Sequence, residues 1–515
     1  MTRDRHWTAI CLWLLLLAAS VAPAYAQADN NVADWQLVQE HWYTVQMAGA
    51  KVGWMFNSVH SDGERYRTAT EVHLRIGRGS TQTKIELRSS FLETHAGQPL
   101  TMRYVGTTGL QPVDSEWRFE EDHVVQITRQ GERETRKEQP LPEGMWLTPV
   151  AAHRYWLQRH EAGAKQITYR TIDAQNGLDP FEVRREYVGV EEFEFDGRTI
   201  PVNVWTTTNS LLPIPALEKY STDGYLVYEE IRAPLFGKMI TRIATKADAL
   251  AEGGGVELLV KTFIKLKQPI DNAQACTTAT LRLHVQEGTM PELPTAGAQR
   301  FAAGDDPTTA TVTIDINHNQ PAGAAEASDA SYLEWSAMVD STDDLIQKLA
   351  AGAVRDAGDD PMARAEAMRA LVHRHVNVKS LDTAFATASE TARMKTGDCS
   401  EHAVLLCAML RAQKVPARVA IGLIYVDSFL GERDIFGWHM WTQALIDGAW
   451  VDFDATLPSR YHAAHVLIAT ARLGDGGLGS ELASTLLLMG NLEIDVLDVG
   501  YEQAKDPRAP SDQTE

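Results

Sequence analysis

The sequence contains little cysteine, and its positive charges are outnumbered by its negative ones. The 515 residues include only four cysteines, too few for a fold framed by disulfides. Lysine and arginine together number 48 against 69 acidic residues, which gives a formal net charge of −21. Because this excess repels phosphate backbones, no nucleic acid is expected as a partner. The hydrophobic fraction of 44% is ordinary for a folded protein and excludes extensive disorder.

Long hydrophobic runs are missing after the first 26 residues, and those residues have the pattern of a secretory signal peptide. Arg3 and Arg5 precede an apolar run over residues 9–22, and residues 24–26 read Ala-Tyr-Ala, a cleavage motif. The run is shorter than the ~20 apolar residues that span a bilayer. We therefore expect a periplasmic or secreted protein with no transmembrane anchor after cleavage of the signal peptide.

The exported chain keeps three cysteines, Cys276, Cys399 and Cys407. Because the number is odd, at least one thiol stays free or pairs outside the chain. Cys407 follows Cys399 by eight residues on one predicted helix. That spacing is about 12 Å of helix rise, which is beyond the reach of a disulfide. Cys407 lies in an apolar run and is expected in the core.

Two kinds of periodicity divide the mature chain. Short runs of alternating polar and apolar residues over 33–250 predict an all-β antiparallel sandwich or open barrel, interrupted by one helix at 149–160. A smaller β segment follows at 256–320, and residues 331–499 change to helical spacing followed by strands, which predicts an α+β domain. A polar tail occupies 504–515. Within the α+β domain the predicted helices are 342–356, 361–376 and one from Asp398 onward, and the predicted strands are 417–425, 437–446 and 450–454.

Residues 397–403, which read Gly-Asp-Cys-Ser-Glu-His-Ala, have the pattern of a helix N-terminus. Asp398 is a good N-cap, and Glu401 completes a variant of the capping box, which places Cys399 at the first helical position. Unpaired backbone N–H groups and the helix dipole favour a thiolate there. The charges of Asp398 and Glu401 oppose it, so we expect a cationic partner.

A hairpin is predicted further along, where the dipeptide Asp-Gly at 447–448 joins two runs of strand-forming residues. In the register that a two-residue loop sets, Asp454 is the diagonal neighbour of His439 on the same face of the sheet. A carboxylate at that place can orient the imidazole and stabilise its protonated form. Asp452 points to the same face and is the alternative for this role.

These motifs together resemble the transglutaminase-like superfamily, whose cores carry cysteine, histidine and aspartate in this order. The similar stretches lie within 396–458 and read G-D-C-S-E-H-A-V-L-L, P-A-R-V-A-I-G-L, H-M-W-T-Q and W-V-D-F-D-A-T. The resemblance implies a papain/transglutaminase-like α+β domain. It also implies that Cys399 is the nucleophile, His439 the base and Asp454 the orienting carboxylate.

Two positions depart from the usual family pattern. Lys414 stands where family members usually have glycine, so either Lys414 is left-handed or the helix ends differently. Gln443 stands where glutamate is frequent. Trp438 and Trp441 flank the predicted base, where they either bind substrate or pack as ordinary strand residues.

The resemblance implies an exported cysteine enzyme that acts on amide or isopeptide bonds of protein or peptide substrates through a thioester acyl-enzyme. Hydrolysis, as in a peptidase or amidase, is the favoured outcome. Transfer to a lysine amine, as in protein-glutamine γ-glutamyltransferases, is the first alternative. A non-catalytic scaffold whose β-rich regions bind cell-envelope proteins is the second.

No cofactor or metal is expected. The closest histidine pairs outside the motifs are His373 with His375 and His462 with His465, and neither has the His-Glu-x-x-His form. We expect both pairs on solvated faces. The sequence contains no glycine-rich phosphate loop, so nucleotide chemistry is not indicated.

Overall fold

The computed structural model describes residues 35–501 apart from short internal segments. These segments are 79–80, 108–111, 131–132, 212–213, 234–236, 255–258, 381–384 and 475–482. The predicted signal peptide at 1–26 and the predicted tail at 504–515 lie outside the described residues. Among the helices that are described, none is long and apolar enough to cross a membrane.

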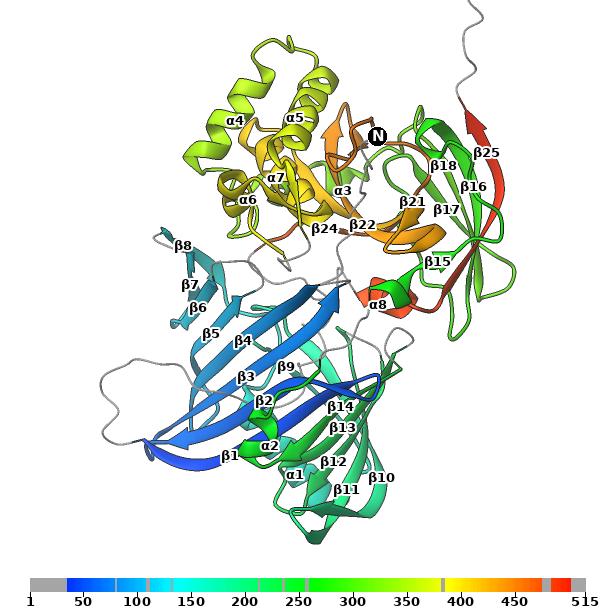
Figure 1. The fold of residues 1–515 in the computed structure, drawn as a ribbon. Coiled ribbons are helices and arrows are strands. Elements are labelled where there is room, and N and C mark those ends of the chain that lie inside the picture. The colour runs from blue at the N-terminus through cyan, green and yellow to red at the C-terminus, as the bar shows by residue number, and fades with distance from the viewer. Residues whose placement is uncertain are drawn as a thin grey trace, which may run out of the picture.

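The N-terminal half is a large antiparallel sheet, coloured blue to green in Figure 1. Its strands are β1 (Gln36–Met47), β2 (Ala50–Ser61), β3 (Arg65–Arg78), β4 (Thr81–Thr94), β5 (Pro99–Thr107), β6 (Val113–Phe119), β7 (His123–Gln130), β8 (Arg133–Pro140), β9 (Gln166–Thr171), β10 (Phe181–Phe195), β11 (Arg198–Asn209), β12 (Ala216–Ser221), β13 (Leu226–Ala233) and β14 (Gly237–Ala244). The described strands form one 14-stranded path from β8 through β1 and β14 to β9. Because β8 and β9 end this path without pairing with each other, the sheet is open. The predicted antiparallel β class is confirmed.

One helix, α1 (Pro149–Glu161), interrupts the strands where the sequence predicts it. Proline stands in its first turn, where a missing N–H costs nothing. Trp156 of α1 is buried, with its ring 5.6 Å from that of Trp205 and 4.9 Å from that of Tyr220. The helix therefore packs on the sheet through a cluster of aromatic side chains.

A smaller sheet joins distant parts of the chain. Its strands are β16 (Cys276–Val285), β17 (Gln299–Ala303), β18 (Thr309–Asp315) and β25 (Leu492–Tyr501), in the order β17-β18-β16-β25. Three of them lie in the predicted β segment at 256–320, whereas β25 comes from the end of the described chain and pairs with β16 (Figure 1). The domain boundaries drawn from the sequence stay a prediction.

The C-terminal part combines helices with a five-stranded sheet in the described residues, of order β15-β22-β21-β24 with β23 paired to β22. The elements are β15 (Ile264–Lys265), α4 (Asp344–Val354), α5 (Pro361–His375), β19 (Val378–Lys379), α6 (Ala388–Met394), β20 (Thr396–Gly397), α7 (Cys399–Ala412), β21 (Ala417–Phe429), β22 (Glu432–Ile446), β23 (Ala449–Phe453), β24 (His465–Ala471) and α8 (Ala483–Leu488). The predicted helices and strands of this domain are confirmed. The remaining short helices are α2 (Lys246–Leu250) and α3 (Ala324–Ala327).

Helix α7 is the centre of this part, because every one of its residues is buried. It contacts α4, α5 and α6 as well as β21 and β22. A helix surrounded in this way must satisfy its polar groups internally. Arg411 does so by donating hydrogen bonds to the carbonyl oxygens of Ala417, Glu334 and Arg472.

The end of α7 shows how the chain accommodates Lys414. Its φ of 63° is left-handed, the first of the two predicted alternatives. The N–H of Lys414 donates to the carbonyl of Arg411, and the N–H of Val415 donates to the carbonyl of Leu410. These two bonds form a Schellman motif, which usually has glycine at the left-handed position.

We predict that Lys414→Gly raises the free energy of unfolding by about 0.5–1 kcal/mol, because it removes the steric cost of a left-handed lysine. Scanning calorimetry of the full chain measures the shift. The control is Lys348→Gly on the exposed face of α4, which lowers stability by about 1 kcal/mol. A Lys414→Gly protein destabilised as much as the control would contradict the prediction.

Candidate active site

The helix end that carries Cys399 is built by the predicted capping box. The Asp398 carboxylate accepts a hydrogen bond from the backbone N–H of Ser400, and the Glu401 carboxyl accepts one from the N–H of Asp398, at 2.9 and 2.8 Å. Gly397 has a φ of +149°, and a Cβ there would lie 2.4 Å from Cβ of Glu401. Glycine is therefore needed for the box to close. Cys399 is the first residue of α7, as predicted, and it is fully buried.

Glu401 opposes a thiolate less than its type suggests. Burial and the neighbouring Asp398 raise the pKa of Glu401 to about 8. The uncharged form of this carboxyl is therefore favoured, although its second oxygen accepts a hydrogen bond from the N–H of Ala386 at 2.8 Å, which favours the charged form. The negative charge expected from Glu401 beside Cys399 is thus reduced.

The hairpin predicted around residues 447–448 is confirmed with its register. Asp447 and Gly448 both have positive φ, 50° and 79°, as a two-residue hairpin turn of this type requires. Strands β22 and β23 pair Thr442 with Phe453, the last residue of β23. Asp454 follows directly and lies diagonal to His439, which is the arrangement that the register predicts.

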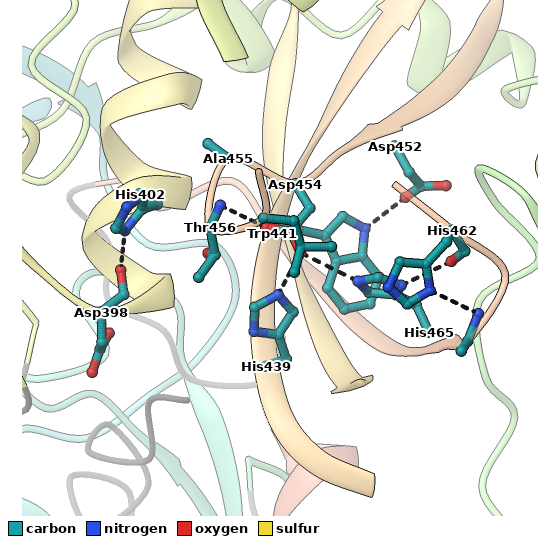
Figure 2. A network of polar contacts seen from close by, with 12 residues as sticks. Asp398, His402, His439, Trp441, Asp452, Asp454, Ala455, Thr456, His462 and His465 are labelled. Carbon is teal, nitrogen blue, oxygen red and sulfur yellow. Dashed lines mark hydrogen bonds and ion pairs between the residues drawn. The ribbon is translucent and has the colours of Figure 1, made fainter. Parts of the chain in front are cut away.

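Asp454, and not Asp452, holds the imidazole. Nε2 of His439 lies 2.8 Å from Oδ2 of Asp454, and both side chains are buried (Figure 2). The other oxygen, Oδ1, accepts the N–H of Thr456 at 2.8 Å. Burial alone would raise the pKa of Asp454, but His439 and His465 hold it well below its ordinary value. With Nε2–H donated to Asp454, Nδ1 is the ring nitrogen that can accept a proton, and it has no hydrogen-bond partner among the residues that the structure describes.

Asp452 has a different role. It accepts hydrogen bonds from the indole N–H of Trp441 at 2.7 Å, from the amide of Gln443 at 2.8 Å and from the backbone N–H of Ala298 at 2.8 Å. It therefore joins β22 to the chain before β17. The same contacts explain Gln443, because a glutamate there would place a second acceptor against Asp452, whereas the Gln443 amide donates.

A second histidine shares the carboxylate of Asp454. Nε2 of His465 lies 3.3 Å from Oδ2 of Asp454, and its Nδ1 lies 2.8 Å from the carbonyl oxygen of His462 (Figure 2). The prediction of solvated faces is wrong for this pair, since His462 is 3% exposed and His465 is 0% exposed. His465 begins β24, which pairs with β21, and the sequence pattern does not show this pairing.

The other predicted pair, His373 and His375, is half-buried rather than solvated. A ring nitrogen of His373 lies 3.1 Å from the carbonyl oxygen of Ala455, and one of His375 lies 2.7 Å from that of Ala392. Each ring therefore makes a hydrogen bond that attaches a neighbouring segment of backbone to α5. The prediction of solvated faces is wrong here as well, because the segments after β23 and in α6 fold over the end of α5.

One described group could bind a metal ion by geometry. Ligand atoms of His439, Asp454 and His465 lie within 4.8 Å of one another, and all three residues are buried. Oδ2 of Asp454 already accepts the Nε2–H of His439, so a cation bound by both groups would have to displace this proton. We therefore interpret His439, Asp454 and His465 as a hydrogen-bonded group rather than as metal ligands.

The two tryptophans beside the base are packed inside the domain. Trp438 is 1% exposed and Trp441 is 0% exposed. The ring of Trp441 stacks near that of His439, with centroids 6.1 Å apart. Gly422 pairs with His439 across β21 and β22, and a Cβ there would lie 2.9 Å from the Trp441 ring. Their burial indicates packing, and a substrate-binding role for either tryptophan stays a prediction.

Specific contacts fix the elements of the site against one another. The Thr442 hydroxyl donates to the carbonyl of Ala403 at 2.9 Å, which joins β22 to α7. Arg369 of α5 donates to the carbonyls of Asp454 at 3.2 Å and of Leu457 at 2.9 Å. The strand with the base, the helix with the thiol and the turn with the carboxylate therefore belong to one buried unit.

Sequence reasoning did not single out His402 or Lys379, and it did not predict the contact of His465 with Asp454. Lys379 Nζ contacts Nε2 of His402, and Nδ1 of His402 contacts the carbonyl oxygen of Asp398. Figure 2 shows His402 and Asp398 on the helix side of the site. His402 lies within the cysteine motif and could have been noticed there. Lys379 and His465 lie in segments with no motif of their own.

A cavity of about 940 Å³ lies between α5, β23 and the chain before β16. Asp452, His462 and Arg369 are among the residues that line it, whereas Cys399 and His439 are not. This cavity is therefore not a cleft that leads to the sulfur of Cys399.

Comparison with known proteins agrees with the motifs. Residues 347–455, which include Cys399, His439 and Asp454, match the model of the transglutaminase-like superfamily. No curated protein matches the chain.

Two solved structures are similar at a lower level. A candidate cysteine protease from Cytophaga hutchinsonii is 19% identical, with a TM-score of 0.27, over 46% of this chain and 89% of that protein. A candidate protease from Parabacteroides distasonis is 9% identical, with a TM-score of 0.18, over 72% of this chain and 68% of that protein. Both scores are too low to carry an argument, so the likeness rests on the family model and the motifs. Residues 347–455 of this chain are thus similar to the core of the transglutaminase-like superfamily.

Proposed function

We propose that this protein is a cysteine enzyme that hydrolyses amide or isopeptide bonds of proteins or peptides. The observation that carries the proposal is the buried pair of His439 and Asp454, whose elements are joined to the helix that begins at Cys399. This pair leaves Nδ1 of His439 able to take a proton. A thiol, a base and a carboxylate in this order are the parts that acyl transfer through sulfur requires.

In the proposed reaction, Nδ1 of His439 takes the proton of Cys399, and the resulting thiolate attacks the substrate carbonyl carbon. The C–N bond breaks as His439 gives this proton to the leaving amine, which leaves a thioester on Cys399. A water molecule then gives a proton to His439 and attacks the thioester, which releases the acid and the Cys399 thiolate, with the proton left on His439. Asp454 keeps Nε2–H in place and stabilises the imidazolium in both steps.

The acyl acceptor decides between hydrolysis and crosslinking. Water reaches a thioester without a binding site of its own, whereas transfer to lysine needs a second protein held beside the sulfur. We therefore propose hydrolysis as the main outcome, with an added amine as a competing acceptor. The backbone N–H of Cys399, at the positive end of the helix dipole, is suited to stabilise the oxyanion.

We also propose that the enzyme acts outside the cytoplasm. The support is the signal-peptide pattern of the first 26 residues. On this proposal its substrates are exported proteins or peptides, and the open N-terminal sheet serves to hold cell-envelope proteins near the site.

We predict that Cys399→Ala lowers peptide cleavage by about 10³-fold or more, because no other group replaces the sulfur. Mass spectrometry of a peptide mixture, with and without an amine donor, detects new carboxyl termini or amine adducts. Cys407→Ala is the matched control, a buried cysteine of the same helix, and it should keep the activity of the parent chain. Amine adducts in place of cleavage would show crosslinking, and an unchanged mixture with the parent chain would favour the scaffold; either result overturns the proposal.

A second prediction separates the two aspartates. Asp454→Asn should lower kcat by about 10²–10⁴-fold, since an amide cannot hold the same imidazole tautomer or stabilise the imidazolium. Asp452→Asn should lower stability by about 1–3 kcal/mol, because buried donors lose their acceptor, while kcat changes little. Steady-state kinetics and thermal unfolding of both variants test this. The assignment fails if Asp452→Asn is the variant with the larger loss of kcat.

A further inference from the structure

Lys379 brings a cation into the interior of the site. It lies on β19, which runs parallel to β20 and pairs Lys379 with Gly397, two residues before Cys399. Its side chain is partly buried and its Nζ contacts Nε2 of His402. A lysine that turns inward at this place, instead of extending into solvent, needs a compensating interaction.

The tautomer of His402 makes it an acceptor for this lysine. Nδ1 of His402 contacts the carbonyl oxygen of Asp398, and a carbonyl only accepts, so Nδ1 carries the hydrogen. Burial and the nearby Lys379 lower the pKa of His402 to about 3, so the ring is neutral near neutral pH. Nε2 is then a lone pair, and the hydrogen bond between the two side chains runs from Lys379 to His402.

The titratable groups that face Lys379 come from three elements. Asp398 and Cys399 belong to the start of α7, Asp454 follows β23, and His373 belongs to α5. Burial lowers the pKa of Lys379 to about 8, although Asp454, Asp398 and Cys399 all favour its charged form. The amine is therefore largely protonated at neutral pH and loses its charge as the pH rises through about 8.

We propose that Lys379 is a positioning residue whose ammonium, held by His402, keeps Cys399 as a thiolate before substrate binds. This inference rests on the proposed role of Cys399 as nucleophile. Lys379 would then be the cationic partner that the sequence analysis expects beside Asp398. A nearby positive charge lowers the pKa of an acid, which makes a thiolate available at neutral pH, and the pairing of Lys379 with Gly397 and its contact with His402 bring this charge to the start of α7.

The test follows the thiolate directly, without substrate. Iodoacetamide alkylation of Cys399 in the full chain is measured from about pH 4 to about pH 10, a span that covers perturbed and ordinary thiols. Mass spectrometry of the peptide that contains Cys399 separates it from Cys276 and Cys407. Lys379→Met should raise the midpoint of the rate by about one pH unit or more, and Lys379→Arg, which keeps the charge, should stay near the parent value. Lys348→Met, which removes an exposed lysine of α4, should change nothing.

The results distinguish this inference from the proposed function. A low midpoint in the parent chain that Lys379→Met leaves unchanged overturns the role of Lys379 alone. A midpoint near the ordinary thiol pKa of about 8.5 in the parent chain overturns the thiolate itself. Circular dichroism reports folding, and Lys379→Gln repeats the loss of charge if the methionine variant does not fold. If neither variant folds, the lysine is structural and the inference is rejected.

Discussion

The burial of an ionised carboxylate at Asp454 is the constraint on which the site depends. Burying a carboxylate without hydrogen bonds or a counter-charge costs a large amount of free energy, so the groups around Asp454 must stabilise its charge. His439 and His465 contact one oxygen, and the N–H of Thr456 reaches the other. Arg369 holds the backbone of the same turn. Contacts with Asp454 thus hold together four parts of the domain: strands β22 and β24, helix α5 and the turn after β23.

The same principle arranges the helix that begins at Cys399. Helix α7 is buried on all sides, and its two ionisable residues of opposite sign are accommodated in different ways. Burial and Asp398 raise the pKa of Glu401, which favours its uncharged form, whereas Arg411 donates hydrogen bonds to three carbonyl groups. Asp398, the N-cap before Cys399, lies where Lys379 enters the site. The contacts that stabilise the buried ionisable groups of α7 therefore also determine the electrostatic surroundings of Cys399.

The large sheet and the small sheet contribute differently. The 14-stranded sheet pairs sequence neighbours almost throughout, so local hairpins build it one strand at a time. The small sheet closes only when β25 returns to β16 from the far end of the described chain. Asp452 then connects this region to β22 through the N–H of Ala298. The segment that carries Cys399, His439 and Asp454 is consequently supported by residues outside its motifs.

The sequence by itself determined the features that depend on neighbours within one turn or one hairpin. The capping box around Cys399 and the register that brings Asp454 to His439 follow from short-range hydrogen bonds and steric limits. For Lys414 the sequence left two alternatives open, and the structure shows the left-handed one. The choice between Asp454 and Asp452, the burial of His465 and the inward course of Lys379 were decided by tertiary structure alone. These three features depend on strand pairing and helix packing between distant segments. The periodicity of a sequence does not show which distant segments contact each other. Local backbone structure therefore places Cys399, His439 and Asp454 on their helix, strand and turn, and long-range packing decides which charged groups surround them.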